Sequence, residues 1–451
     1  MKSINPFNNE LIKEYQEYNQ EEVEQIIRNA DEAYRSWRNS SFDERSVKMK
    51  KAAEILLDNK QQYGELISTE MGKIIKESVS EVEKCAWVCN YYADNAKKFL
   101  ADEPIETDAA KSMVSFEPLG VILSIMPWNF PFWQVFRFAA PTIMAGNAGL
   151  LKHASNVSGC SLEIEKIFKE AGFPDNLFRS LLVPGSKVDE VIQNPLVKAV
   201  TLTGSEGAGR SVAKTAGAEL KKTVLELGGS DPFIVLEDAD LEACVETAVT
   251  ARMINTGQSC IAAKRFIVVD EIADKFEKMT VRRMQKITAG NPFDEASGAG
   301  PLAKPEFVDD IIRQVSESVE QGAEILLGGN RRDRKGNFFE PTVLKNVTPG
   351  MPAFDEETFG PVFSIIRVND EKEAIDMANK SSFGLGGALW TKDVEHGERL
   401  ARLVETGAIF VNGMTKSDPR MPFGGIKNSG YGRELSHYGI REFVNIKSIS
   451  I

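Results

Sequence analysis

Histidine is scarce in this sequence, with three residues in 451: His153, His396 and His437. A cysteine–histidine hydrolase needs a histidine close to its nucleophile. His396 falls in a charged helical stretch and His437 in a polar segment near the end of the chain, so neither favours that mechanism. The sequence also contains no histidine pair and no Cys–His cluster, which disfavours a zinc dehydrogenase.

Cysteine is sparse as well. The five cysteines are Cys85, Cys89, Cys160, Cys244 and Cys260, an odd number without a tight pairing pattern. Such usage is typical of a reducing compartment. Cys85 and Cys89 are four residues apart on a predicted helix, and without a nearby histidine we expect helix packing there and no metal site.

Long apolar runs and a basic excess are both missing. The longest apolar run, near residues 119–126, is about eight residues, whereas a membrane helix needs about 20. Residues 1–10 are polar and lack the apolar core of a signal peptide. The formal net charge is -12, which argues against nucleic acid or an anionic membrane as partner. We therefore expect a cytoplasmic protein.

The composition is that of an ordinary globular protein, at 42% hydrophobic and 27% charged residues, and the length suggests about two to three domains. Residues 21–99 have helical spacing throughout and predict a helical N-terminal layer. Residues 102–118 alternate loosely and predict a β-ribbon. The tail, residues 443–451, has a β pattern that could pair with this ribbon.

Two regions alternate between strands and helices. In the first, strands are expected at 120–125, 149–152, 178–183 and 198–202, with helices at 132–145, 160–171 and 188–193. In the second, strands are expected at 232–236, 264–269, 362–368, 387–390 and 407–411, with helices at 240–254, 273–287, 307–321, 371–380 and 394–404. This spacing predicts an α/β fold with two doubly wound, largely parallel sheets, of which the first is a candidate for nucleotide binding.

Cys260 closes the stretch Asn255-Thr-Gly-Gln-Ser-Cys260, between a predicted helix and a predicted strand. A thiol on a loop between rigid elements could act as a nucleophile. The alternative is a small buried hydrophobic residue, since free cysteine is among the most buried residue types.

Two further stretches combine glycines with polar groups. Residues 203–209 follow a predicted strand and open a predicted helix, where backbone N–H groups could hold a phosphate; a plain strand–turn–helix junction is the alternative. Glu226 ends a strand-like run and precedes Gly228 and Gly229. It could be a general base or a capping acid.

Asn129 lies between two prolines in Pro127-Trp-Asn-Phe-Pro131. Its amide could stabilise an oxyanion, or the segment could be only a rigid turn. Together, a thiol, a carboxylate, an amide donor and a phosphate cradle fit the oxidation of a carbonyl through a thio-intermediate, with a dinucleotide as hydride acceptor.

These stretches occur in the order found in a known family. The sequence resembles the aldehyde dehydrogenase superfamily in Pro127-Trp-Asn-Phe-Pro131, Leu202-Thr-Gly-Ser205, Glu226-Leu-Gly-Gly229, Asn255-Thr-Gly-Gln-Ser-Cys260, Glu357-Thr-Phe-Gly-Pro361 and Pro422-Phe-Gly-Gly425. The resemblance covers essentially the whole chain. It implies a cofactor domain (1–101 and 119–227), a catalytic domain (228–430) and an oligomerisation ribbon with tail (102–118 and 431–451), in a homodimer or homotetramer.

The resemblance also implies roles for single residues. Cys260 would attack the aldehyde, Asn129 and the Cys260 backbone N–H would hold the oxyanion, and Glu226 would activate water. Because Glu226 is present, release of a free carboxylic acid is favoured over transfer of the acyl group. The residues expected to contact NAD or NADP are Trp128, Asn129, Lys152, His153, Ala154, Ser155, Gly204, Ser205, Leu227, Glu357 and Phe359.

Ser155 departs from relatives that prefer NAD, which often have a glutamate at the matching position. A hydroxyl can hydrogen-bond to a 2′-phosphate that a carboxylate would repel, so acceptance of NADP is predicted. The neighbours of Cys260 include no second cysteine, so a local disulfide switch is not expected.

For the substrate, Arg137 lies in the segment that lines the tunnel in this family, among aromatic residues. An arginine there is costly unless it meets an anion. Ser417-Asp-Pro-Arg420 is similar to bacterial succinate-semialdehyde dehydrogenases. Arg137 and Ser417 are therefore predicted to bind the distal carboxylate of succinate semialdehyde; a salt bridge to a neighbouring acid is the alternative for Arg137. Other aliphatic or aromatic aldehydes, or a non-catalytic family member, remain as alternatives.

Overall fold

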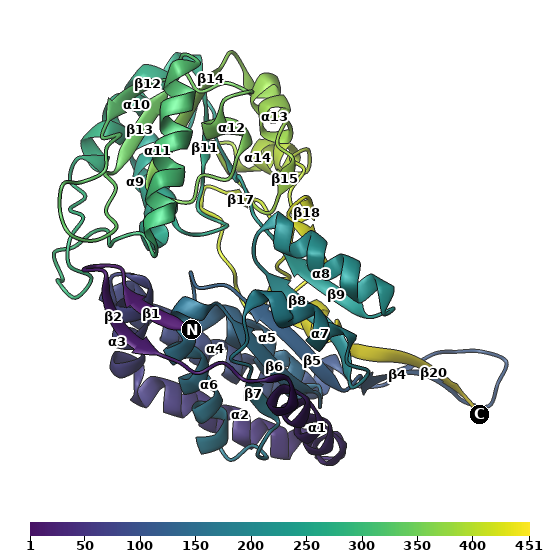
Figure 1. Ribbon diagram of the computed structural model, residues 1–451. Coiled ribbons are helices and arrows are strands. Elements are labelled where there is room, and N and C mark those ends of the chain that lie inside the picture. Colours follow the sequence, from purple (N-terminus) through teal and green to yellow (C-terminus); the bar gives the residue numbers. More distant parts are fainter.

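The structure is a computed structural model that describes residues 1–451. Figure 1 shows two α/β parts, a six-stranded sheet with its helices below and a seven-stranded sheet with its helices above, and a β-ribbon that projects from the lower part. The α/β class and the two doubly wound sheets predicted from the sequence are confirmed.

The six-stranded sheet is parallel except at one edge, where β19 runs antiparallel to β9. Its order is β19-β9-β8-β5-β6-β7. The central strands are buried on both faces, as their nearly continuous apolar runs predict. The strands are β5 (Val121–Met126), β6 (Ala148–His153), β7 (Phe178–Ser180), β8 (Val197–Thr203), β9 (Lys222–Glu226) and β19 (Gly430–Tyr431).

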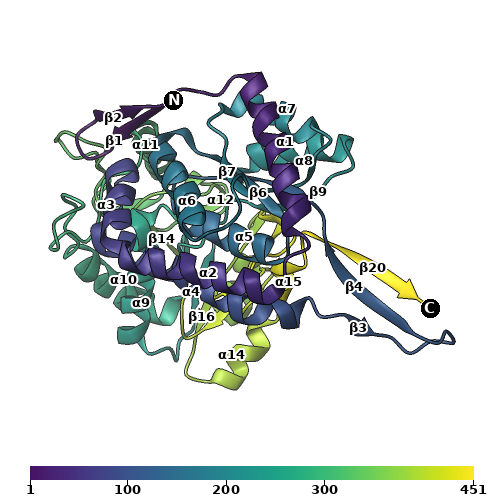
Figure 2. The same ribbon diagram turned by 90° about the horizontal axis from the view of Figure 1, so that it is seen from below.

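Helices cover this sheet on both faces, and Figure 2 shows the N-terminal helices from below. The first begins at a capping box, in which Asn19 and Glu22 satisfy each other's backbone N–H groups. The helices and 3₁₀ turns are α1 (Gln20–Trp37), α2 (Phe42–Asp58), α3 (Lys60–Met71), α4 (Ile75–Phe99), α5 (Trp133–Met144), η1 (Ser155–Val157), α6 (Ser158–Glu170), η2 (Gly185–Lys187), α7 (Val188–Gln193), α8 (Glu206–Ala218) and α15 (Ser436–Ile440).

The seven-stranded sheet has the order β12-β13-β14-β11-β10-β16-β17 and is parallel except for the antiparallel pair β12–β13. Side chains of one strand alternate between two cores: Phe233 and Val235 pack in one and Ile234 in the other. The strands are β10 (Pro232–Val235), β11 (Arg265–Val269), β12 (Glu324–Leu327), β13 (Thr342–Lys345), β14 (Val362–Val368), β16 (Ala388–Trp390) and β17 (Phe410–Val411).

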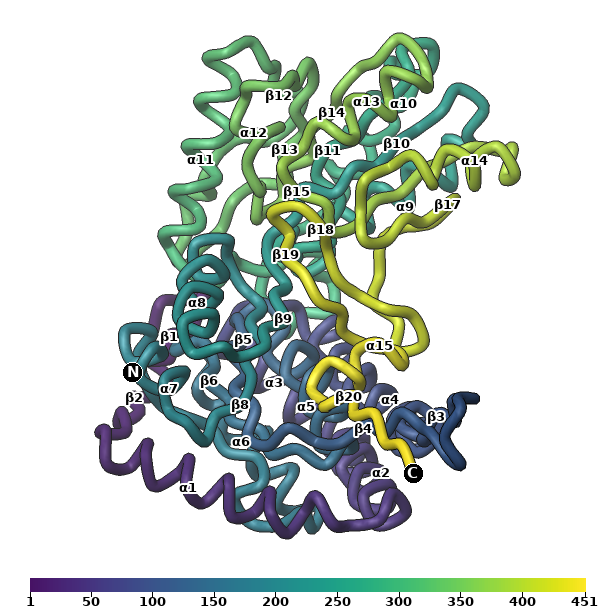
Figure 3. The backbone as a smooth tube through the Cα atoms, turned by 90° about the vertical axis from the view of Figure 1, so that its right-hand side faces the viewer, coloured from purple at the N-terminus to yellow at the C-terminus, as the bar shows by residue number.

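Helices also cover the seven-stranded sheet. They are α9 (Leu241–Met253), η3 (Ile254–Gly257), α10 (Asp270–Met284), α11 (Pro305–Glu320), α12 (Pro352–Asp355), α13 (Glu371–Asn379) and α14 (Val394–Ala401). The backbone trace in Figure 3 shows that the chain enters this upper part after β9 and returns to the lower part through β18 and β19. A small sheet of β15 (Phe383–Gly384) and β18 (Ile426–Lys427) lies on that return path.

The ribbon is formed by segments far apart in the sequence. β4 (Ser112–Pro118) pairs with β3 (Glu103–Pro104) on one side and with β20 (Val444–Ser450) on the other, both antiparallel. Figures 1 and 2 show β4 and β20 extending away from the body. The predicted pairing of the tail with the earlier ribbon is confirmed.

The fold differs from the sequence-based expectations in several places. The polar N-terminus forms a strand pair, β1 (Lys2–Asn5) and β2 (Glu10–Glu14), whose largely exposed side chains give no period-2 apolar signal. The helical layer predicted for residues 21–99 is confirmed and consists of four helices, one of which ends at the left-handed Gly72. The edge strands β7 and β17 are shorter than predicted. No helix has both the length and the apolar character needed to cross a membrane.

Candidate active site

Cys260 lies on a strained loop between α9 and β11. Asn255 and Thr256 have φ values of 52° and 57°, and Gly257 follows at 78°. A threonine in the left-handed region is uncommon because of its β-branch. At Gly257, an added Cβ would lie 2.2 Å from the carbonyl oxygen of Gly360, so only glycine fits there. The loop conformation is therefore imposed by its surroundings.

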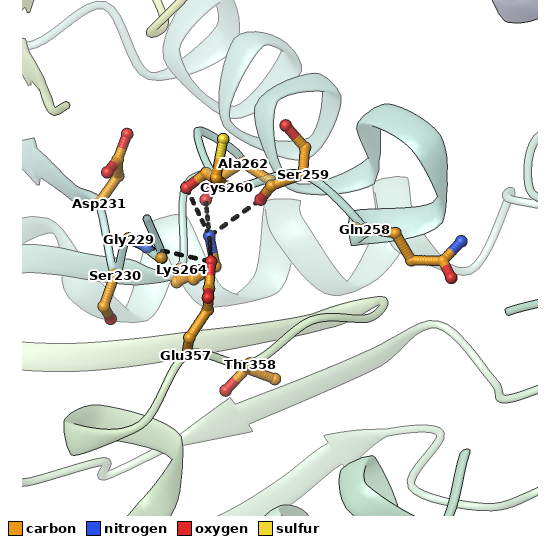
Figure 4. Close-up of polar contacts among 12 residues, drawn as sticks. Gly229, Ser230, Asp231, Gln258, Ser259, Cys260, Ala262, Lys264, Glu357 and Thr358 are labelled. Carbon is orange, nitrogen blue, oxygen red and sulfur yellow. Dashed lines mark hydrogen bonds and ion pairs between the residues drawn. The ribbon is translucent and has the colours of Figure 1, made fainter. Parts of the chain in front are cut away.

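Two buried cations hold this loop from below. Arg252 donates to the carbonyl oxygens of Gly257 (2.6 Å) and Ala263 (2.9 Å). Lys264 donates to the carbonyl oxygens of Ser259, Cys260 and Ala262 at 3.0, 2.8 and 3.1 Å (Figure 4). Since both side chains are fully buried, these contacts fix the backbone on either side of the cysteine.

Lys264 also connects the loop to Glu357. Its ammonium lies 3.5 Å from Glu357 Oε1, and the same oxygen accepts a hydrogen bond from the N–H of Gly229 at 3.1 Å (Figure 4). Burial raises the pKa of Glu357, and the charge of Lys264 opposes that rise. No sequence motif pointed to Lys264, because a lysine at the start of a strand has no periodic signal.

The thiol of Cys260 differs from the other four. Cys260 is half-buried, whereas Cys85, Cys89, Cys160 and Cys244 are buried. Burial raises the pKa of Cys260 to about 12; Glu357 adds to the rise, and Arg137 and Lys264 oppose it. The thiol is therefore protonated and needs a proton acceptor before it can react as a thiolate.

Asn129 is fixed beside this loop. Its side-chain Nδ2 donates to the backbone carbonyl oxygen of Gln258 at 3.1 Å, and its backbone carbonyl oxygen accepts from Asn255 Nδ2 at 2.8 Å. An amide nitrogen carries two hydrogens, so the second N–H of Asn129 can serve a ligand. The loops after β5 and after α9 are thus joined where the motifs predicted a shared site.

Glu226 ends β9 and is 2% exposed, with no hydrogen-bond partner at either carboxyl oxygen. Burial raises its pKa well above the usual value, and the nearby carboxylate of Glu434 raises it further. Two neighbouring buried carboxyl groups do not both ionise easily, because the negative charge of one opposes the ionisation of the other. Glu226 is therefore a buried carboxyl group that can hold or accept a proton in this site.

Arg137 is paired with an acid within the protein. Its guanidinium forms a buried ion pair with Glu434 and donates to Thr203 Oγ1 at 3.3 Å. The guanidinium also lies 4.7 Å from the ring of Phe423. The salt bridge considered as the alternative reading of Arg137 is thus present, although Arg137 also lines the cavity described next.

A cavity of about 490 Å³ opens above the thiol. Ser417, predicted to bind substrate, lies in its wall, where its Oγ accepts a hydrogen bond from Lys84 Nζ at 2.7 Å. The lining residues are Lys76, Glu77, Ser80, Glu81, Lys84, Phe130, Trp133, Gln134, Arg137, Ile254, Ser259, Cys260, Ile261, Met414, Thr415, Lys416, Ser417 and Phe423. Lys84 was not identified from the sequence, because its contact with Ser417 joins residues 333 positions apart.

The expected cofactor residues lie along the carboxyl ends of the six-stranded sheet and on the facing loop. Ser205 caps α8, and Gly204 precedes it. Leu227 packs on α8, where an added Cβ at Gly209 would lie 2.6 Å from its methyl groups. Across from them, the ring of Phe359 meets that of Trp128 at 5.8 Å in an edge contact.

The segment from Lys152 to Ser155 ends β6. Lys152 is half-buried and has no carboxylate within ion-pair distance; burial lowers its pKa, and Lys304 contributes to this. Ser155 is exposed at the start of η1. These two side chains, together with the main chain of Ala154, can face a ligand.

His153 serves the fold. Its Nε2 lies 2.9 Å from the carbonyl oxygen of Pro131, and its Nδ1 accepts from the N–H of Ala154 at 3.0 Å. Burial lowers its pKa to about 4, so the ring is neutral. With both ring nitrogens occupied, a cofactor contact from His153 would have to come from its main chain.

Comparison with known proteins gives one consistent picture. The model of the aldehyde dehydrogenase family matches residues 1–449. A probable NADP-dependent succinate-semialdehyde dehydrogenase of Synechocystis is 49% identical over 449 residues, covering 100% of this chain and 99% of its own. Succinate-semialdehyde dehydrogenase [NADP(+)] 1 of Mycobacterium tuberculosis is 47% identical over 454 residues, with the same coverage. The crystal structure of succinic semialdehyde dehydrogenase from Streptococcus pyogenes in complex with NADP⁺ superposes with a TM-score of 0.98 at 38% identity, covering 100% of this chain and 99% of that one.

Proposed function

The chain belongs to the aldehyde dehydrogenase family, and from this premise we propose that it oxidises succinate semialdehyde to succinate, with NADP as its preferred hydride acceptor and NAD as a second one. The observation that carries the substrate assignment is the cavity in which the Cys260 thiol and the polar wall of Arg137 and Ser417 face one space. A short aldehyde with a carboxylate at its far end matches both. The relatives that share the whole chain support the same substrate class.

The protein's own residues divide the chemistry among them. Cys260 gives its thiol proton to Glu226 and attacks the aldehyde carbon as the thiolate, and the oxyanion of the resulting thiohemiacetal is held by the amide of Asn129 and the backbone N–H of Cys260. After Glu226 has released that proton to solvent, it accepts a proton from the water that hydrolyses the thioester. The unpartnered carboxyl oxygens and raised pKa of Glu226 support this role.

A dinucleotide fits the residues along the carboxyl ends of the six-stranded sheet. The N–H groups at the start of α8 suit a pyrophosphate, and the carboxylate of Glu357 suits a ribose hydroxyl pair. When bound, NADP would supply the hydride acceptor for the oxidation of the thiohemiacetal. The rings of Trp128 and Phe359, which contact each other edge to face, would lie beside the nicotinamide of the cofactor.

The preference for NADP rests on the end of β6. Ser155 offers a hydroxyl where a carboxylate would repel a 2′-phosphate, and Lys152 is a cation without a carboxylate partner. Phosphate groups are strong acceptors for such donors. These features support tighter binding of NADP than of NAD.

The decisive measurement is steady-state formation of reduced cofactor by purified enzyme with succinate semialdehyde, butanal and benzaldehyde, each with NADP and with NAD. We expect the highest kcat/KM for succinate semialdehyde with NADP. Equal values for butanal or benzaldehyde would refute the substrate assignment. Cys260→Ala should abolish turnover of every aldehyde, and any remaining turnover would refute the covalent mechanism.

The ribbon supports an assembly of copies of this chain. β20 projects from the body and exposes Ile446 (62% exposed), with Ile105 (47%) on the neighbouring segment. We assign residues 102–118 and 431–451 to an oligomerisation element in a homodimer or homotetramer, 1–101 and 119–227 to a cofactor domain, and 228–430 to a catalytic domain. Light scattering should report two or four chains per particle; a monomer would refute the assembly.

A further inference from the structure

Some charged side chains around the cavity have hydrogen-bond or ion-pair partners within the protein, and others do not. Glu77 accepts a hydrogen bond from the N–H of Asn255 at 3.1 Å. Glu81 is ion-paired with Lys73 and accepts from the N–H groups of Phe132 and Trp133 at 2.9 and 3.0 Å. The acids of the lining are thus occupied by groups that belong to the fold.

Among the cations of the lining, Arg137 is paired with Glu434, and Lys76 and Lys416 are exposed. Lys84 is different, because it is half-buried and no carboxylate lies within ion-pair distance of its ammonium. A charge withdrawn from water without a partner costs free energy. Lys84 is therefore the one half-buried cation of the lining that has no ion-pair partner within the protein.

The position of this ammonium is fixed by two neighbours. Its Nζ donates to Ser417 Oγ at 2.7 Å and lies 4.1 Å from the centre of the Trp133 ring. An ammonium has three donor hydrogens, so two remain for a ligand. Burial lowers the pKa of Lys84 to about 8, with Arg137 adding to the effect and Cys85, Glu81 and Asp418 opposing it. An anion in the cavity would restore the charged form.

We propose that Lys84, from the N-terminal helical layer, is a substrate-binding residue that holds the distal carboxylate of succinate semialdehyde together with the hydroxyl of Ser417. This inference rests on the proposed function and adds to it a binding residue and a division of labour. Lys84 provides the free positive charge. Arg137 is already ion-paired with Glu434, so it acts on the substrate mainly through the electric field of its charge.

The division of labour decides which variant is informative. Removing Arg137 would leave Glu434 buried, unpaired and close to Glu226, so it should impair the oxidation of every aldehyde. Removing Lys84 leaves no protein carboxylate unpaired. Lys84→Met, which keeps the length of the side chain, is therefore the selective test, and Lys84→Arg is the conservative partner.

The experiment compares kcat/KM for succinate semialdehyde and for butanal, an uncharged aldehyde with the same number of carbons, in the wild type, Lys84→Met, Lys84→Arg and Lys98→Met. Lys98 is an exposed lysine on the same helix, away from the cavity, and controls for the loss of one charge. Calorimetric titration with succinate gives a second readout that does not depend on turnover. Activity on butanal also reports whether each variant is folded.

We expect Lys84→Met to lower kcat/KM for succinate semialdehyde by about 10- to 100-fold, the loss of one charge-assisted hydrogen bond. The dissociation constant of succinate should rise by a similar factor, while butanal changes by less than about 3-fold. Lys84→Arg should restore most of the loss, and Lys98→Met should match the wild type.

Equal losses for both aldehydes in Lys84→Met, or an unchanged value for succinate semialdehyde, would overturn the assignment of Lys84. If Lys84→Met does not fold, Lys84→Gln takes its place, and a Lys84→Gln enzyme that prefers succinate semialdehyde over butanal as strongly as the wild type would also overturn the assignment. A wild type that does not favour succinate semialdehyde over butanal and does not bind succinate would instead overturn the proposed function. The wild-type measurements therefore test the proposed function, and the variants test the assignment of Lys84.

Discussion

Replacement of Lys264 by methionine tests whether a buried ammonium holds the reactive loop. Lys264 is 1% exposed and makes three hydrogen bonds to carbonyl oxygens of the loop, besides its ion pair with Glu357. Methionine keeps the length but provides no donor and no charge. Breaking a buried ion pair by removing one partner costs about 3–5 kcal/mol, and three carbonyl groups lose their donor as well. We expect a loss of unfolding free energy in that range.

The thiol should respond in the same variant. Lys264 is one of the cations that oppose the rise in the pKa of Cys260, so its removal should raise the thiol pKa further and slow the reaction of the thiol. Chemical denaturation gives the stability, and the rate of alkylation by iodoacetamide as a function of pH gives the thiol pKa. The double variant with Glu357→Gln is the control, because it leaves no unpaired carboxylate and should be less destabilised than the sum of the single changes. A Lys264→Met enzyme within about 1 kcal/mol of the wild type, with an unchanged alkylation profile, would refute the reasoning.

Three further predictions follow from the site. Glu226→Gln should still release one equivalent of reduced cofactor in a burst, slowed because the thiol loses its proton acceptor, but turn over more slowly still, because the thioester is no longer hydrolysed; stopped-flow measurements that find no burst would contradict the assigned role. Ser155→Glu should lower kcat/KM for NADP by at least about 10-fold while leaving that for NAD nearly unchanged, since a carboxylate repels the 2′-phosphate; parallel losses for both cofactors would contradict it. For Lys84, whose pKa is lowered to about 8, the charged form is lost as pH rises, so the ratio of kcat/KM for succinate semialdehyde to that for butanal should fall above about pH 8. The charged and titratable groups that face Lys84 are Glu81 and Cys85 on its own helix, Arg137 on α5 and Asp418 on the loop after β17. If the ratio of the two kcat/KM values does not change with pH, Lys84 does not titrate in this range.

The parts of the site that sequence reasoning found were those carried by local patterns. Cys260, Glu226 and Asn129 each lie at or just after the end of an expected strand or helix, so the predicted alternation of elements placed them in or beside loops. The same reasoning predicted the parallel sheets and the pairing of the tail with the ribbon. The motifs and the alternation of strands and helices depend on residues close in sequence and on periodic burial, whereas the long-range pairing of the ribbon was expected because both of its segments have a β pattern.

The parts that it missed depend on contacts between distant segments. Lys84 lies on a helix whose spacing indicates only packing, and its role depends on Ser417 in another part of the chain. The partner of Arg137 could not be identified either, because several acids follow it and only the fold brings Glu434 to it. Lys264 lacked any pattern because a cation that binds carbonyl oxygens needs no acidic residue at a fixed spacing.

The antiparallel pairing of β20 with β4 also has a consequence for the order in which this protein can fold. β4 has its full set of partners only after residues 444–450 pair with it, and β9 has a partner on its outer side only after β19 pairs with it, so both pairings join segments far apart in the sequence. Glu434, the acid beside Glu226, lies between these two strands in the sequence. The active site is therefore complete only after the segment between β19 and β20 has packed beside Glu226. A chain that stops short of residue 430 should accumulate as an inactive, partly folded species with an unpaired sheet edge.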